Sequence, residues 1–166
     1  NYNFLVMEYM GSSLEKLFEN HNKKFSLKTI IMLTIDLLKN LQYVHQNNII
    51  HRDLKPDNIV IGNNNNNCNV YLLDFGLSKN YRNKESGNHI ELVKNKSLVG
   101  TMRYASIRNH KGYEQSRRDE LESLGYILLY LLRGGDLPWN GLPSENKEEK
   151  SKKICQIKSN VNLEEL

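Results

Sequence analysis

The sequence predicts an α+β fold that is mainly helical, with one short β-hairpin between its helices. Three observations support this prediction: a segment from Ser26 repeats apolar residues every three or four positions, two β-prone runs flank a glycine and a tract of asparagines, and residues 120–132 are apolar almost all round. With 166 residues, 39% of them hydrophobic and 25% charged, the chain has the size and composition of one globular domain.

The first predicted elements are a strand and two helices. Residues 4–9 are apolar and β-prone, which predicts the strand. Ser12 and Glu15 have the spacing of a capping box, so a short helix should follow. Ser26 is the expected N-cap of a longer helix. We expect the apolar residues of this helix to share one buried face: Leu27, Ile30, Ile31, Leu37, Leu38, Leu41 and Val44.

The β-prone runs at residues 58–61 and 69–73 should pair as an antiparallel hairpin. The asparagines of residues 63–67 lie between them. We interpret this tract as a lengthened, solvated hairpin tip, because asparagine tolerates turn conformations and offers no apolar surface.

The second half of the chain begins with residues 74–109, which have no sustained periodicity and therefore predict a long functional loop. A central buried helix should follow over residues 120–132. The polar residues 144–159 predict a surface helix.

Charge and cysteine content narrow the class of protein. The net charge of +4 and the pI of about 9.0 are mild and do not require a nucleic-acid partner. Cys68 and Cys155 lie far apart without metal-ligand spacing, which fits a reducing compartment. No apolar run approaches the roughly 20 residues of a membrane helix, and no signal-peptide pattern is seen. We therefore expect a soluble monomer in the cytoplasm or nucleus that binds neither membrane nor nucleic acid.

The segment HRDLKPDN, residues 51–58, carries the residue types that phosphoryl transfer needs. That reaction needs a carboxylate near the attacking hydroxyl, a cation near the transferring phosphoryl oxygens and oxygen ligands for magnesium. Alone, the segment could be a polar turn that arose by chance. Asp74, Phe75 and Gly76, however, follow the second predicted strand. The two motifs in this order resemble the catalytic loop and the Asp-Phe-Gly motif of protein kinases.

Four further segments resemble the casein kinase 1 family more specifically. They are KFSLKT at residues 24–29, GTMRYASI at 100–107, QSRRDELESLGY at 115–126 and LPWNGL at 137–142. The resemblance implies a serine/threonine-protein kinase, and it assigns residues 1–166 to a partial protein kinase domain made of the hinge and the helical large lobe.

The resemblance also implies roles for the residues of both motifs. Asp53 would be the catalytic carboxylate and Lys55 the cation, and this lysine points to serine/threonine rather than tyrosine substrates. Asn58 and Asp74 would bind Mg²⁺, which bridges the phosphates of ATP. Thr101 would hydrogen-bond Asp53 and Lys55 and so connect the substrate platform, the segment of residues 100–107 that faces the substrate, to the catalytic loop.

Further resemblance places the nucleotide. Met7 matches the gatekeeper beside the adenine, and Glu8 and Met10 would offer hinge backbone groups. Val60 would form the apolar floor under the adenine ring, and Leu73 would line the nucleotide pocket. For Met7, Val60 and Leu73, plain core packing is the alternative explanation.

Family members favour acidic or already phosphorylated sequences near the target residue. Arg103 and Lys150 match two positions that bind such groups, and charge-assisted contacts from both side chains could supply the preference. For Lys150 a solvated helix surface is an equal alternative, because Glu148 and Glu149 lie beside it.

The sequence departs from the family in several places. It contains no glycine-rich phosphate loop, no strand lysine and no helix glutamate partner, all of which a complete kinase uses. Glu120 stands where most kinases have an aspartate that braces the catalytic loop, and whether the longer side chain reaches is open. Lys16 replaces an acidic residue near the ribose. A pseudokinase or scaffold that binds partners without catalysis is therefore the alternative to an active kinase.

Overall fold

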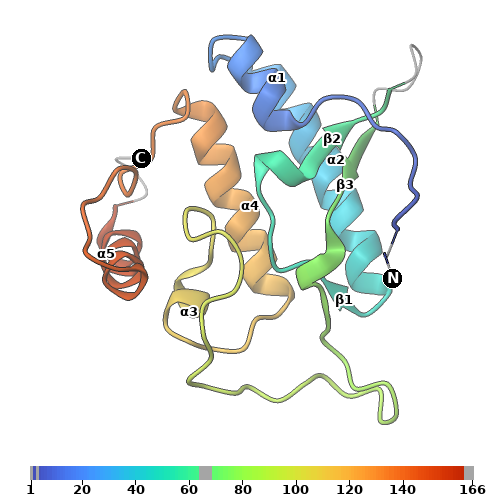
Figure 1. Ribbon diagram of the computed structural model, residues 1–166, viewed down its shortest axis with the longest axis vertical. Helices are drawn as coiled ribbons and strands as arrows, with labels where there is room; N and C mark the ends of the chain where they lie inside the picture. The colour runs from blue at the N-terminus through green and yellow to red at the C-terminus, as the bar shows by residue number, and fades with distance from the viewer. Residues whose placement is uncertain (1, 3, 64–68, 163–166) are drawn as a thin grey trace.

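The computed structural model describes residues 2, 4–63 and 69–162, and it has the predicted α+β architecture (Figure 1). Its helices are α1 (Leu14–Asn20), α2 (Leu27–Gln46), α3 (Ile107–His110), α4 (Arg117–Leu132) and α5 (Lys147–Asn160). Its strands are β1 (Ile49–Ile50), β2 (Ile59–Ile61), β3 (Val70–Leu72) and β4 (Lys79–Asn80), and its 3₁₀ turns are η1 (Pro56–Asn58) and η2 (Phe75–Leu77). In Figure 1, α4 lies between α5 on one side and α2 with the small sheets on the other.

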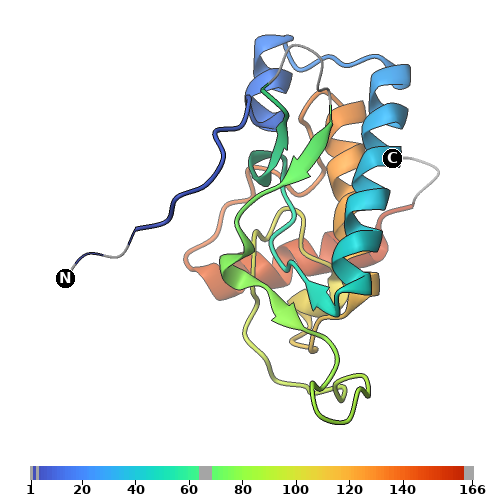
Figure 2. The same ribbon diagram turned by 90° about the vertical axis from the view of Figure 1, so that its right-hand side faces the viewer.

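The predicted first strand is wrong. Residues 4–12 have an irregular backbone and run away from the body of the protein in Figure 2. Phe4, Leu5 and Val6 are 87%, 85% and 92% exposed. A strand needs a neighbour that pairs with its N–H and C=O groups, and β-propensity cannot replace that neighbour. The segment joins the fold at Gly11, whose N–H donates to the Ile61 carbonyl at 2.9 Å.

Gly11 makes this junction possible. A Cβ atom at this position would lie 2.6 Å from the Ile61 carbonyl oxygen, too close for any other residue without a shift of the backbone. Ser13 then forms an isolated bridge with Val60 and caps α1, its hydroxyl accepting from the Lys16 N–H at 3.3 Å. The cap is thus Ser13 and not the predicted Ser12.

Helix α2 begins after Ser26 as predicted, and the Ser26 hydroxyl accepts from the Thr29 N–H at 3.1 Å. Its buried side chains are Ile30, Leu33, Leu37, Leu41 and Val44. Three residues that we expected on the same face are exposed: Leu27 by 64%, Ile31 by 50% and Leu38 by 44%. The predicted face was too wide, because α2 packs on α4 and β3 through a narrower stripe.

The described residues contain two antiparallel pairs of strands, and the segment between β1 and β2 connects them. The predicted hairpin is present as β2 and β3, with Val60 opposite Tyr71. A second pair joins β1 to β4, with Ile50 opposite Lys79. We did not predict β1 and β4 from the sequence, because strands of two residues are too short to show a period. Residues 64–67 of the predicted hairpin tip, with Cys68, lie outside the described residues.

Helix α4 is the predicted central helix. It buries Leu124, Ile127, Tyr130 and Leu131 in the core together with Trp139 and residues of α1 and α2. No helix among the described residues is long and apolar enough to span a membrane. Helix α5 is the predicted polar surface helix, but it buries two residues, Ile154 and Lys158.

Candidate active site

The residues between β1 and η1 hold Asp53 in a fixed position. Asp53 is 8% exposed, and its carboxylate is contacted by Thr101 and Lys55. The Thr101 hydroxyl donates to Oδ1 at 2.7 Å, and the Lys55 ammonium lies 3.0 Å from Oδ2. The predicted contact between Thr101 and Asp53 is therefore present.

The same contacts control the charge of Asp53. Burial acts to raise the pKa of the carboxyl, but the hydrogen bond from Thr101 and the ammonium of Lys55 outweigh it, so the pKa lies below the ordinary value of 3.8. Asp53 is therefore ionised at neutral pH, with both oxygens oriented.

Thr101 reaches Asp53 because the preceding residue is a glycine. Gly100 has a φ of +91°, and a Cβ atom there would lie 2.3 Å from the Arg52 carbonyl oxygen. Any other residue would push the two segments apart. Close backbone approach at this point thus brings the Thr101 hydroxyl within reach of the carboxylate.

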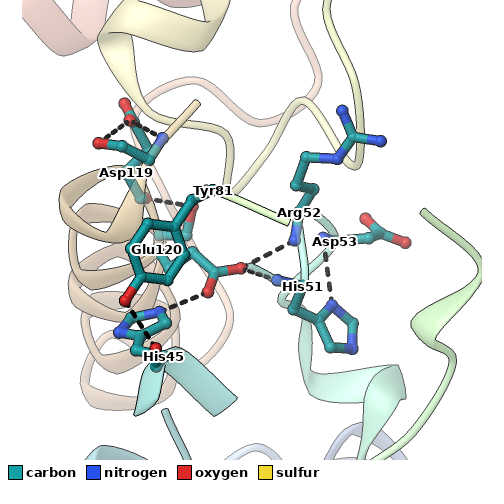
Figure 3. A network of polar contacts seen from close by, with 9 residues as sticks. His45, His51, Arg52, Asp53, Tyr81, Asp119 and Glu120 are labelled. Carbon is teal, nitrogen blue, oxygen red and sulfur yellow. Dashed lines mark hydrogen bonds and ion pairs between the residues drawn. The ribbon is translucent and has the colours of Figure 1, made fainter. Parts of the chain in front are cut away.

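Glu120 braces the catalytic loop from α4 (Figure 3). Its Oε1 accepts two successive backbone N–H groups, from His51 at 2.6 Å and from Arg52 at 2.8 Å. Arg52 has a left-handed φ of 69°, a conformation that costs about 1–3 kcal/mol outside glycine. The longer side chain therefore reaches the loop, and its carboxylate stabilises a strained turn immediately before Asp53.

The second oxygen of Glu120 faces α2. Oε2 lies 2.7 Å from the His45 Nε2, and Glu120 is only 2% exposed. The Tyr81 hydroxyl donates to the His45 carbonyl at 2.6 Å, so the segment after β4 is fixed to the same point (Figure 3). Sequence reasoning missed His45 and Tyr81, because neither belongs to a motif that carries chemistry.

His51 links the two motifs. Its Nε2 lies 2.8 Å from the Leu73 carbonyl, so this nitrogen must carry the proton, and Nδ1 is then free to accept from the Asp53 N–H at 3.2 Å. The ring also packs on Phe75 with a centroid distance of 4.8 Å. The residue before Asp74 and the residue after it are thus both in contact with the catalytic loop.

Asn58 and Asp74 are brought together by the hairpin. The Leu73 N–H donates to the Asn58 carbonyl at 2.8 Å, which places Asp74 next to Asn58. The Asn58 amide nitrogen donates to the Asp53 carbonyl at 3.0 Å, so its amide oxygen is the atom available to a cation. An amide oxygen and a carboxylate are ligands that Mg²⁺ accepts when substrate phosphates and waters complete its shell. The two residues fit this ion.

The predicted nucleotide contacts are only partly assembled. Val60 is 4% exposed in the hairpin, and Leu73 is half-buried beside Asp74. Met7 is 56% exposed, Glu8 is exposed, and both lie on the segment that leaves the body of the protein. Met10 is half-buried next to Gly11. The contacts of all five residues with adenine stay predictions.

Arg103 is exposed on the surface near the active site. Its guanidinium lies 5.6 Å from the centre of the Tyr130 ring and 5.9 Å from that of Tyr104. The Tyr130 hydroxyl donates to Glu15 at 2.6 Å, which fixes the ring. Lys150 is half-buried at the start of α5. Their roles toward substrate stay predictions.

A protein kinase domain model matches residues 1–166. The chain is also 49% identical over 164 residues to a probable casein kinase I homolog of Encephalitozoon cuniculi (strain GB-M1), with 99% of this chain and 53% of the relative covered. It therefore spans about half the length of this relative. By these matches, the chain belongs to the protein kinase family, in its casein kinase 1 branch.

Proposed function

We propose that this chain provides the catalytic loop and the substrate platform of a serine/threonine-protein kinase, which transfers the γ-phosphoryl group of MgATP to protein hydroxyls. The observation that carries the proposal is the double contact of the Asp53 carboxylate with Lys55 and Thr101. By resemblance to kinases, residues 74–107 are the activation segment, which starts at the Asp-Phe-Gly motif and contains Thr101. A charged carboxylate held between a cation and a residue of this segment can orient a hydroxyl for attack and accept its proton.

Each group at the site has a separate task in this reaction. Asp53 orients the substrate hydroxyl and takes up its proton. Lys55 can move from Asp53 to the transferring phosphoryl group, because a flexible ammonium is able to serve both. Bound Mg²⁺ would neutralise charge on the phosphates, with Asn58 and Asp74 as its protein ligands. Glu120 keeps the turn before Asp53 in place.

We further propose that the substrates carry acidic or phosphorylated residues near the target. Arg103 supports this, because its guanidinium is exposed, is held over two aromatic rings and follows the Thr101–Asp53 contact by two positions. A guanidinium presented in this way can bind a carboxylate or phosphate through two hydrogen bonds. The two rings restrict the Arg103 side chain before substrate binds, so less conformational entropy is lost on binding.

The proposal is tested with the protein as it is made in the cell, incubated with MgATP and serine peptides rich in either aspartate or lysine. We expect phosphorylation of the acidic peptide, and loss of activity when EDTA removes the metal. Asp74→Asn should raise the Mg²⁺ concentration needed for half-maximal activity. A wild-type protein that binds peptides without transferring phosphate would instead support the non-catalytic scaffold.

A further inference from the structure

Helix α5 places a buried cation against the activation segment. Lys158 is 4% exposed, and its ammonium donates to the Ala105 carbonyl at 2.6 Å and to the Met102 carbonyl at 3.1 Å. A buried lysine is uncommon, because removing an ammonium from water is costly unless its donors are satisfied. Both carbonyls belong to the segment that carries Arg103.

Aromatic rings complete the surroundings of this ammonium. The Lys158 Nζ lies 4.3 Å from the centre of the Tyr126 ring and 5.0 Å from that of Trp139, within the range of cation–π attraction. The Trp139 indole N–H itself donates to the Arg103 carbonyl at 2.8 Å. The carbonyls of residues 102, 103 and 105 are thus all held by this one cluster.

The segment held in this way connects both proposed substrate contacts. The N–H groups of Tyr104 and Ala105 donate to the Thr101 carbonyl at 3.0 Å, which closes a turn around Arg103. Thr101 holds Asp53 at one end of that turn, and Arg103 projects from its middle. Fixing the Met102 and Ala105 carbonyls therefore fixes the direction in which Arg103 points relative to Asp53.

We propose that Lys158 is a positioning residue for substrate recognition: its ammonium holds the turn of residues 101–105 in the shape that presents Arg103 to an acidic substrate. This inference rests on the proposed kinase function and deepens it. Lys158 touches neither substrate nor nucleotide in this account. It acts through the Met102 and Ala105 carbonyls.

Several titratable groups face Lys158, and together they decide its charge. They are His110 from α3, with Nε2 at 3.4 Å, Glu122 and Tyr126 from α4, and Cys155 from α5 itself. Burial lowers the pKa of Lys158 to about 7, against the smaller opposing effects of Glu122 and Cys155. Burial and the Lys158 charge lower the pKa of His110 to about 4, so His110 is neutral above pH 5. Lys158, unlike His110, therefore loses its charge between pH 6 and pH 8.

The competing explanation is that Lys158 only anchors α5 to the domain. If Lys158 were only an anchor, its replacement would lower the stability of the protein and would change the Michaelis constants for ATP and for the peptide together. A positioning residue should affect the Michaelis constant for the peptide and leave that for ATP unchanged. Because a charged donor makes a stronger hydrogen bond than a neutral one, the effect should also depend on pH.

The experiment compares Lys158→Met with Lys152→Met in the protein as it is made in the cell. Methionine keeps the length of the side chain and removes the charge. Lys152 lies on the same helix, is exposed and pairs with Glu148, so its variant controls for the loss of one lysine from α5. The substrate is an aspartate peptide, because a phosphopeptide would itself titrate near pH 6.

We expect Lys158→Met to raise the KM for the peptide roughly tenfold at pH 6, because a displaced Arg103 loses its charge-assisted hydrogen bond to the acidic peptide, with the KM for ATP unchanged. The peptide KM of the wild type should rise roughly threefold from pH 6 to pH 8, and that of Lys158→Met should not. Equal changes for peptide and ATP, or a peptide KM of the wild type that is constant with pH, would overturn the proposal. If Lys158→Met does not fold, a wild-type peptide KM that stays constant from pH 6 to pH 8 still overturns the proposal.

A second readout does not need activity. Amide hydrogen exchange of Tyr104 and Ala105 should be faster in Lys158→Met than in the wild type or Lys152→Met, since their turn loses its support. Unchanged exchange would contradict the positioning role. A wild type that phosphorylates no peptide, with faster exchange in Lys158→Met, would reject the proposed function and keep the structural role of Lys158.

Discussion

Glu120 on α4 accepts a hydrogen bond of 2.6 Å from the backbone N–H of His51, which lies 69 positions earlier in the chain. The same oxygen accepts from the Arg52 N–H at 2.8 Å. One carboxylate therefore satisfies a buried donor, at His51, and a partly buried one, at Arg52, in a turn where Arg52 is left-handed. The position of Asp53 depends on this support from the central helix.

Removing the Glu120 carboxylate should destabilise the protein and disturb its activity. Glu120→Ala leaves the His51 and Arg52 N–H groups without an acceptor, and each buried unpaired donor costs about 1–3 kcal/mol. We expect a loss of about 2–4 kcal/mol in the free energy of unfolding, measured by urea denaturation. Glu19→Ala, at an exposed position of α1, is the matched control. If Glu120→Ala lost no more free energy of unfolding than this control, the hydrogen bonds from Glu120 to the catalytic loop would not contribute to stability.

Removing the Thr101 hydroxyl should raise the pKa of Asp53. The hydrogen bond from the Thr101 hydroxyl is the largest of the interactions that lower this pKa, so Thr101→Val should move the acid limb of the kcat/KM profile toward higher pH. Activity near pH 5 should fall more than activity near pH 7.5. Thr101→Ser keeps the hydroxyl and should behave like the wild type. An acid limb that does not move would mean that another group determines it.

Arg103→Ala should slow phosphorylation of a primed peptide, one that already carries a phosphorylated residue near the target, far more than of an unprimed one. A hydrogen bond to a charged group contributes about 1.5–3 kcal/mol, which corresponds to a loss of about 10- to 150-fold in kcat/KM for the primed peptide. Added salt should reproduce part of the loss, because it screens an exposed ion contact. Equal slowing of both peptides would assign Arg103 to the structure of the activation segment.

The buried Lys158 also predicts how stability depends on pH. Its pKa is about 7 in the folded protein and ordinarily 10.5, so between these values the unfolded chain binds more protons than the folded one. Stability therefore rises with pH in this window. From pH 7 to pH 9 we expect a gain of about 2 kcal/mol in the wild type beyond any gain in Lys158→Met. Urea denaturation at both pH values measures it, and equal gains would contradict a depressed pKa.

The sequence predicts the parts of this fold that depend on local chemistry. Ser26 marks the start of α2 because a hydroxyl can cap the free N–H groups of a helix, and the β2–β3 hairpin follows from two short β-prone runs. The relation of Asp53 to Thr101 was accessible only through the resemblance. Their contact depends on the approach of Gly100 to Arg52, which no local pattern reveals.

Other features depend on tertiary contacts, and local patterns did not predict them. Lys158 appears in a polar helix, and only the packing of α5 on the activation segment shows that it is buried. Whether Glu120 reaches the catalytic loop depends on the distance between α4 and that loop. Strand β1 forms because β4 pairs with it. Residues 4–9 have the sequence pattern of a strand, but the described residues provide no strand that pairs with them.

The proposed kinase function depends on Asp53 as the catalytic carboxylate. The most direct test is the rate of phosphate transfer from MgATP to an acidic serine peptide by the wild type and by Asp53→Asn. The amide keeps the shape and can still accept from Thr101, but it has neither the charge nor the capacity to take up a proton. We expect Asp53→Asn to remain folded, with cooperative unfolding in urea, and we expect a fall in kcat of at least about 100-fold, the lower range for loss of a general base. A rate near that of the wild type would show that Asp53 is not the catalytic carboxylate.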